Sequence, residues 1–247
     1  MPDLEAAIVG LQTEVEAIPE GHPAMPNDLG DCRSERTGIV QDLGAAISRL
    51  EAAVEVTPED HPDRAALLNN LAKQLSCRYE QTGNLPDLEA AITRLEAAVK
   101  ATPGNHPTRA ARLNNLGECL SSRYERTGIL QDLQAAIALS GAAVELTIEG
   151  HPDRAGWLTN LGNHLDSRYK RTGNLQDLEA AITRSEAAVE ATPEGHPDRA
   201  GRLNNLGKCL RSRYRRYGNL PDIEVAITLS ETALQATPKG HPARAQM

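Results

Sequence analysis

The segment HPTRAARLNNLGECLSSRYERTGILQDLQAAIALSGAAVELTIEG, residues 106–150, decides how the chain folds, because most of the chain repeats it. His-Pro steps recur every 45 residues, at His61, His106, His151, His196 and His241. A fixed period of roughly 20–50 residues is typical of stacked repeats, in which each unit packs only on its neighbours. We therefore expect a single solenoid over residues 1–247.

The repeats are regular from residue 41 to residue 240, and the two ends differ from them. Residues 1–40 form a degenerate N-terminal unit with a shortened first half, in which Pro26 interrupts the helical pattern. Proline inside a helix removes a hydrogen bond and clashes with the preceding turn, so we expect a short or broken helix near residues 27–37. Residues 241–247 contain only the truncated start of a further unit.

The sequence pattern of each full unit predicts two helices. The first begins at the His-Pro step and carries apolar side chains at the spacing of one buried face, namely Leu113, Leu116, Leu120 and Tyr124. Gly128 would end it in the left-handed conformation. The second helix begins near Asp132 and is rich in alanine, which favours helix and allows close approach. Short loops make consecutive helices antiparallel, so the fold class is all-α.

Composition excludes several functional classes. The net charge of −8 argues against a general nucleic-acid or anionic-membrane binder. The chain has no Phe and one Trp, so its core must be aliphatic, and no apolar run is long enough to span a membrane. The four cysteines form no CxxC motif, and the N-terminus does not resemble a signal peptide. We expect reduced thiols and a cytoplasmic location.

The first helix, with Leu113, Leu116, Gly117 and Leu120, resembles that of the tetratricopeptide repeat. Alanines in the second helix (Ala136, Ala143) and a proline at the unit's end (Pro103, Pro193) continue the resemblance. The unit is longer than that family's usual repeat. Its LNNLG motif is similar to that of the kinesin light chain type and of repeat arrays in large fungal proteins. The resemblance implies a right-handed superhelical solenoid of antiparallel helix pairs, whose first helices line a concave groove.

Comparison of the copies identifies candidate contacts in that groove, because packing positions should be identical and recognition positions should vary. They are the first asparagine of each pair, the residue after the glycine, and positions one turn further: Asn69, Asn114, Asn204, Lys73, Glu118, Asn163, Lys208, Ser121, Asp166 and Arg211. A row of carboxamides suits an extended peptide, whose main chain both donates and accepts. Alternatively, these asparagines tie neighbouring helices together, which we favour for the second asparagine of each pair, such as Asn115.

Two local departures from the repeat are further candidates. Trp157 stands where other copies have leucine or arginine, which indicates either a ligand hot spot or neutral drift. The last full first helix is basic, with Lys208, Arg211, Arg213, Arg215 and Arg216. Such a run is usually a solvated face, and an acidic peptide or an acidic neighbouring subunit is the alternative.

The invariant arginines and histidines favour structural roles. We assign the Arg-Tyr pairs, such as Arg123-Tyr124, to packing between repeats. We assign the arginine of each HPxR step to bonding with loops and helix ends, with carboxylates of the adjacent unit as partners. The histidines of successive units lie too far apart to share a metal. The column of Cys119, His164 and Cys209 fits packing better than metal binding, with His164 the odd member.

Three functions compete on these observations. The leading hypothesis is a scaffold that binds an extended peptide or a partner helix, with a protein or peptide as partner and neither nucleic acid nor membrane. The second is a fragment or structural module that self-associates end to end, as a homo-oligomer through uncapped ends. The third, an enzyme acting around His164 and Asp166, is the weakest, because no phosphate loop or nucleophile with an adjacent base is present. We therefore predict no catalytic residue, cofactor or metal.

Overall fold

The computed structural model describes residues 38–236, which form nine helices and no strand. The all-α fold predicted from the 45-residue period is therefore confirmed over this range. The degenerate unit expected at 1–40, up to the start of the first described helix at Gly38, lies outside the described residues, as does its broken helix near 27–37. The truncated unit at 241–247 lies outside them as well.

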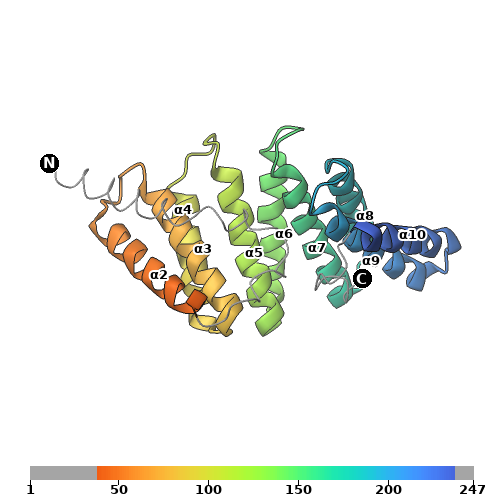
Figure 1. The fold of residues 1–247 in the computed structure, drawn as a ribbon, viewed down its shortest axis with the longest axis horizontal. Helices are drawn as coiled ribbons and strands as arrows, with labels where there is room; N and C mark the ends of the chain where they lie inside the picture. Colours follow the sequence, from red (N-terminus) through yellow and green to blue (C-terminus); the bar gives the residue numbers. More distant parts are fainter. Residues whose placement is uncertain (1–37, 237–247) are drawn as a thin grey trace. The chain divides into compact units, whose positions relative to one another are not determined.

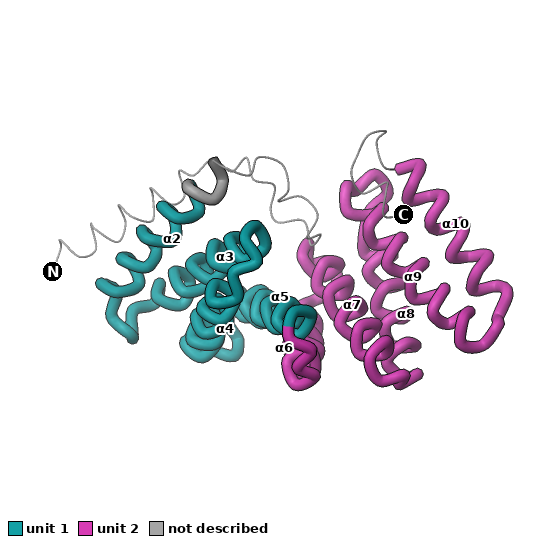
Figure 2. The backbone as a smooth tube through the Cα atoms, turned by 90° about the horizontal axis from the view of Figure 1, so that it is seen from below, with its two compact units in different colours: residues 1–126 teal, residues 127–247 magenta. Residues whose placement is uncertain are grey.

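The helices fall into two compact units, each an array of antiparallel neighbours (Figures 1 and 2). Unit 1, Met1–Arg126, contains α2 (Gly38–Val56), α3 (Arg64–Thr82), α4 (Leu85–Lys100) and α5 (Arg109–Thr127). Unit 2, Thr127–Met247, contains α6 (Leu130–Glu145), α7 (Arg154–Thr172), α8 (Leu175–Glu190), α9 (Arg199–Tyr217) and α10 (Leu220–Ala236). In the repeat, α3, α5, α7 and α9 are the first helices, and α4, α6, α8 and α10 are the second helices.

Each first helix ends at a glycine in the left-handed conformation, as the sequence predicted. The φ angle is 70° at Gly83, 74° at Gly173 and 72° at Gly218. Each of these glycines donates its N–H, at 2.7 Å, to the carbonyl of the tyrosine four residues earlier in the same helix. A side chain at this φ would place Cβ against the following carbonyl. The turn is therefore tight, and the second helix begins two residues later.

A bidentate ion pair spans each of these turns and joins the two helices of a unit. Arg78 donates from Nε and Nη2 to both carboxylate oxygens of Asp87, at 2.8 and 2.6 Å, and Arg213 binds Asp222 in the same way. Both aspartates are buried, and hydrogen bonding to the guanidinium lowers the pKa of each carboxyl. The arginine of each such Arg-Tyr pair thus has a structural partner, which agrees with the packing role inferred from its invariance.

The first and second helices of a unit lie in close contact at the repeat glycine. A Cβ added to Gly162 of α7 would lie 3.0 Å from Ser185 Oγ and 3.4 Å from the Ala181 carbonyl of α8. Alanine takes the corresponding position in α3, as the fully buried Ala72. Small residues therefore let the helix backbones pack closely, with fully buried leucines such as Leu71, Leu88 and Leu178 on either side.

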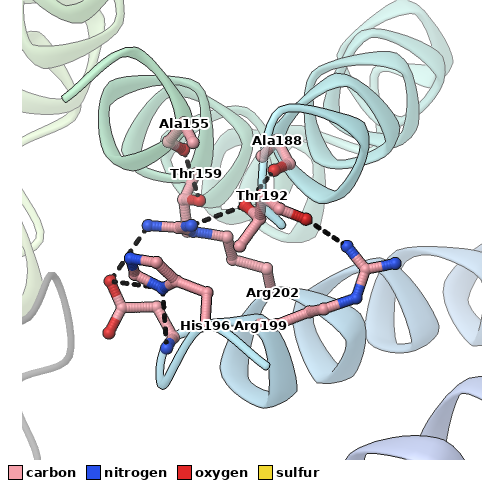
Figure 3. A network of polar contacts seen from close by, with 8 residues as sticks. Ala155, Thr159, Ala188, Thr192, His196, Arg199 and Arg202 are labelled. Carbon is pink, nitrogen blue, oxygen red and sulfur yellow. Dashed lines mark hydrogen bonds and ion pairs between the residues drawn. The ribbon is translucent and has the colours of Figure 1, made fainter. Parts of the chain in front are cut away.

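At each junction between repeats, an arginine closes the end of the preceding second helix (Figure 3). Arg199 Nη1 donates to the carbonyls of Val189, at 2.9 Å, and of Thr192. The side chain of Thr192 turns back to the Ala188 carbonyl at 2.5 Å. The helix-end bonding expected for the HPxR arginines is therefore confirmed, whereas the expected carboxylate partners are wrong. Carbonyl groups at a helix C-terminus lack partners within the helix and carry partial negative charge, so they attract the cation instead.

The histidine of each His-Pro step caps the next first helix, which begins three residues later than predicted. His196 Nδ1 accepts the backbone N–H of Asp198 at 3.2 Å, and His61 Nδ1 accepts that of Asp63 at the same distance. The histidine carbonyl also accepts the N–H of the residue three positions on, at 3.0 Å for Arg199. The step is thus a hydrogen-bonded turn that uses up donors which the helix start would leave unpaired.

The described helices also bear on membrane insertion. None of them combines the length and apolar character that crossing a bilayer requires.

Two glycines of unit 2 give a matched test of this backbone geometry. Gly173→Ala should lower the free energy of unfolding by about 1 kcal/mol, because alanine must adopt a positive φ. Gly141→Ala, inside α6 with open space around its Cβ, should raise it by about 0.5–1 kcal/mol, because alanine favours helix. Urea unfolding followed by circular dichroism measures both. Equal effects of the two substitutions would contradict the assigned turn.

Candidate functional site: the faces of the first helices

The candidate residues all lie on first helices, α3 and α5 in unit 1 and α7 and α9 in unit 2. Their exposure divides them into two sets. The exposed or half-buried set is Asn69, Lys73, Glu118, Asn163, Lys208 and Arg211. The buried set is Asn114, Ser121, Trp157, Asp166 and Asn204.

The exposed set follows from the register of the repeat. Lys73, Glu118, Asn163 and Lys208 each follow the glycine, or Ala72, that packs against the second helix. The residue after the closest helix contact is turned away from it by about 100°, towards solvent. One position in every copy is therefore free to vary, and it carries a cation, an anion, a carboxamide and a cation in turn.

The buried set offers a partner little surface. Asn114 is 2% exposed and Asn204 is 7% exposed, so the predicted row of carboxamides does not form an open strip in either unit. Asp166 is 8% exposed; its Oδ2 accepts from Lys170 Nζ at 2.6 Å, one turn further along α7. These side chains therefore lie among the packed helices rather than on an open surface.

Asparagines join neighbouring first helices in unit 1. The Nδ2 of Asn115 on α5 donates to Oδ1 of Asn69 on α3 at 3.0 Å. The tie predicted for the second asparagine of each pair is thus confirmed for Asn115, and its acceptor is the first asparagine of the preceding repeat. Cys119 on α5 also donates from Sγ to Ser76 Oγ on α3 at 3.7 Å.

The corresponding acceptor on α9 has no such donor among the described residues. In unit 2 the Oδ1 atom of Asn204 is buried and has no hydrogen-bond partner among the residues that the structure describes. Thr159 replaces the asparagine of the preceding copy, and its hydroxyl donates to the Ala155 carbonyl of its own helix at 2.8 Å. The asparagine contact of unit 1 is therefore interrupted between α7 and α9.

Trp157 is enclosed by its own repeat junction. It is 6% exposed, and its ring stacks on His151 with centroids 5.3 Å apart and an interplanar angle of 26°. At the same position Arg202 is buried and donates to Thr192 Oγ1 at 2.5 Å and to Asp198 at 3.0 Å. Trp157 therefore fills the space that a hydrogen-bonded arginine fills in other copies.

Cys119, His164 and Cys209 occupy a buried column that faces other repeat helices. Burial raises the pKa of the Cys119 and Cys209 thiols to about 12, so both are protonated at neutral pH. His164 Nδ1 lies 3.3 Å from Ser140 Oγ of α6. Burial lowers the pKa of His164 to about 4, against the opposing effect of a hydrogen bond with the Ala136 backbone. The imidazole is therefore a neutral packing group that pairs with a serine.

His164 and Asp166 do not share a site. Residues two apart on a helix point in different directions, and here His164 contacts α6 whereas Asp166 pairs with Lys170. Among the described residues no cluster of three or more histidine, cysteine, aspartate or glutamate side chains is arranged to hold a metal ion.

The cations of α9 differ in whether an anion neutralises them. Arg213 binds Asp222 and also Glu179, at 2.9 Å, and these hydrogen bonds raise the pKa of its guanidinium. Among the described residues no acidic partner lies within ion-pair distance of Lys208, Arg211, Arg215 or Arg216. The helix contains no aspartate or glutamate. Its outer face therefore carries uncompensated positive charge.

Sequence reasoning missed two functional positions. One is the threonine after each second helix, Thr102 or Thr192, which accepts from the buried arginine of the next repeat. The other is the serine column of Ser140 and Ser185 in the second helices, which faces His164 and Gly162. Both recur at 45-residue intervals, so pairing the variable positions of one repeat with those of the next could have found them.

Comparison with known proteins identifies the repeat. Residues 109–153 and 154–198 each match the family model of the tetratricopeptide repeat, in two consecutive units of 45 residues. Comparison with curated proteins finds no significant relative.

Solved structures show the same fold at low sequence identity. BtubC (BKLC) from P. vanneervenii has a TM-score of 0.61 at 18% identity, over 97% of this chain and 94% of that chain. A putative kinesin light chain from Podosopora anserina with nearly identical TPR-like repeats has a TM-score of 0.57 at 19% identity, over 81% of this chain and 92% of that one. YrrB, described as a TPR protein with an unusual peptide-binding site, has a TM-score of 0.51 at 19% identity, over 80% and 82%.

Because His164 is buried against α6, we expect the stability of the fold to fall in acid. The unfolded chain binds a proton at His164 below about pH 6.5, whereas the folded chain resists protonation until about pH 4. The free energy of unfolding should therefore be unaffected above pH 6.5 and should fall by on the order of 3 kcal/mol as the pH drops to 4.

Urea unfolding between pH 7.5 and 4.5 measures this dependence. His164→Cys is the matched control, because cysteine occupies the same position in α5 and α9. The variant should lose most of the pH dependence between 6.5 and 4.5. An unchanged slope in that variant would show that other groups cause the acid sensitivity.

Proposed function

We propose that this chain, whose residues 109–198 are tetratricopeptide repeats, is a protein-interaction scaffold that binds an extended peptide or a partner helix along its first helices. The proposal rests on a division of labour within each unit. Arginine contacts, bidentate ion pairs and, in unit 1, an asparagine pair fix the helices. The exposed or half-buried position after the repeat glycine changes its chemistry from copy to copy.

The observation that carries the proposal is the uncompensated charge of α9. Lys208, Arg211 and Arg215 follow one another at spacings of three and four residues, so they lie on one face of the helix. Asn163 on the neighbouring first helix α7 adds an exposed carboxamide. A row of cations beside a group that both donates and accepts suits a main chain carrying carboxylates. We infer that unit 2 binds an acidic segment of a partner protein.

Unit 1 presents a different face, and this difference supports selective recognition. Its exposed and half-buried positions include Lys73 on α3 and Glu118 on α5, which carry opposite charges. Interactions between like charges suppress wrong partners, so each unit selects a different segment chemistry. YrrB, with its described peptide-binding site, shares this fold, which is compatible with the proposal.

The positions of His164 and Asp166, the residues of the enzyme hypothesis, also favour a binding role over a catalytic one. His164 is buried against Ser140, and Asp166 is paired with Lys170, so the two side chains proposed for catalysis act in separate contacts. We propose no catalytic residue, and no cofactor or metal enters the proposed binding function.

Fluorescence anisotropy with a labelled peptide, (Glu-Gly-Ser) repeated five times, tests the acidic-segment proposal. The intact chain should bind it saturably, and the affinity should fall as salt is raised from 50 to 300 mM, because exposed charges are screened. Lys208→Glu with Arg215→Glu should weaken binding by about tenfold or more, since attraction becomes repulsion.

The charge-matched control is Arg49→Glu with Lys100→Glu, which places the same two reversals on α2 and α4. This variant should bind the acidic peptide within about twofold of the wild type. Equal losses in both variants would reduce the effect to net charge and would contradict a site on α9. The same peptide with lysine in place of glutamate should not bind.

A further inference from the structure

The outer face of α10 exposes an isoleucine at a repeat position that is buried in α4 and α8. Ile227 is 53% exposed, whereas the corresponding Ile182 of α8 and Ile92 of α4 are each 3% exposed. Leu234 lies seven residues further along the same face of α10 and is 37% exposed. Isoleucine is therefore kept at the first position, and what differs there is whether a following first helix packs on it among the described residues. The counterparts of Leu234 are valines, of which Val144 is buried and Val99 and Val189 are half-buried.

Unit 2 shows which helix covers the corresponding face of α8. That helix is the next first helix, α9, which lies against α8 within the unit (Figure 2). Hydrogen bonding with Ser185 of α8 acts on the Cys209 thiol, and Arg199 and Arg202 bind the end of α8. The α8–α9 contact is thus an interface whose α8 half recurs in part on α10, where the described residues contain no following first helix.

A cavity marks the place on α10. It has a volume of about 230 Å³ and is lined by Arg211, Ala226, Ile227, Ser230, Glu231 and Leu234. Ser230 corresponds to Ser185, which contacts the next first helix, and its hydroxyl donates to the Ala226 carbonyl of its own helix at 2.8 Å. The cavity therefore lies where the packing residues of a following first helix would enter.

An unpartnered polar atom on α9 points to the same occupant independently. Asn204 Oδ1 is buried and has no hydrogen-bond partner among the described residues. In unit 1 the equivalent atom, Asn69 Oδ1, accepts from Nδ2 of Asn115, the second asparagine of the next first helix. A buried acceptor without a donor costs free energy, so the occupant that relieves it must supply an N–H at this point.

We propose that α9 and α10 form a docking site for one further helix with the first-helix pattern of this repeat. The occupant buries its leucines against Ile227 and Leu234. It places the second asparagine of its LNN motif against Asn204. This site uses the apolar side of α10 rather than the exposed cations Lys208 and Arg215, and it meets the acidic-segment site at Arg211, which lines the cavity.

One further position sets the preferred sequence of that helix. In unit 1 Ser76 accepts from Cys119 of the next first helix, and in unit 2 the charge of Asp166 acts on Cys209. The corresponding residue on α9 is Arg211, which lines the cavity. An occupant with an acceptor at the cysteine position therefore suits Arg211 best, and α3 carries one there, Gln74.

A peptide with the sequence of residues 64–82, RAALLNNLAKQLSCRYEQT, is accordingly the probe. Isothermal titration calorimetry should show saturable one-to-one binding to the 247-residue chain. In the peptide, Asn70→Ala removes the donor for Asn204 and should weaken binding by about fivefold. Asn69→Ala, at the first asparagine, should change the affinity by less than about twofold.

The protein variants separate the docking face from the rest of α10. Ile227→Asp with Leu234→Asp should abolish peptide binding, because both substitutions place a carboxylate in the apolar face. Val225→Asp is the matched control: Val225 is 48% exposed on the same helix but does not line the cavity, so this variant should bind normally. Circular dichroism should show all variants equally helical.

Three results would overturn the proposal. They are no binding of the peptide, binding that survives the double substitution, and equal effects of the two peptide asparagines. Analytical ultracentrifugation tests the competing occupant, which is a second copy of the chain. A dimer of the whole chain that Ile227→Asp with Leu234→Asp disperses, together with no peptide binding, would assign the face to a second copy instead. None of these results depends on the acidic peptide, so the two proposals fail or stand separately.

Discussion

The repeat depends on one contact, the arginine that binds the carbonyl end of the preceding second helix. Arg64, Arg109, Arg154 and Arg199 each donate from Nη1 to two carbonyls, one valine and one threonine. The last carbonyls of a helix have no partners within it, and they carry the negative end of its dipole. A single guanidinium satisfies two of them and at the same time fixes where the next first helix begins. The spacing of the repeat thus follows from the reach of one side chain across a short loop.

The 45-residue period was sufficient to predict the helix pairs, their glycine stops and their leucine cores, because those features depend on neighbours within one repeat. The burial of Asn114 and Asn204 was not predictable in the same way. A helical pattern shows that these residues lie beside the buried stripe, and whether they are covered depends on how the neighbouring helices pack on them. The arginine contacts were misjudged for a related reason. A carboxylate can be recognised in a sequence as aspartate or glutamate. The backbone carbonyl groups that bind Arg199 are present in every residue, so these partners can be identified only once the end of the helix is known.

One buried position shows how much chemical variety this junction accepts. Leu67, Arg112, Trp157 and Arg202 occupy the same place in successive repeats, and each is between 5% and 7% exposed. Each polar version brings its own partner: Arg112 and Arg202 bind the threonine at the end of the preceding helix, and Trp157 stacks on His151. Burial lowers the pKa of both guanidinium groups, which shows that their desolvation is only partly offset. Variation at this position therefore reflects compensated packing, whereas variation after the glycine reaches solvent.

The buried thiols have a consequence for covalent chemistry. Thiolate is the species that reacts with electrophiles and peroxides, and a pKa of about 12 leaves almost none of it on Cys119 or Cys209 near neutral pH. Cys77 is half-buried instead. Of these three thiols, Cys77 is thus the one open to alkylation or oxidation while the helices stay packed. A maleimide dye or a spin label attached to Cys77 would report on the face of α3 and leave the buried Cys119 and Cys209 chemically untouched.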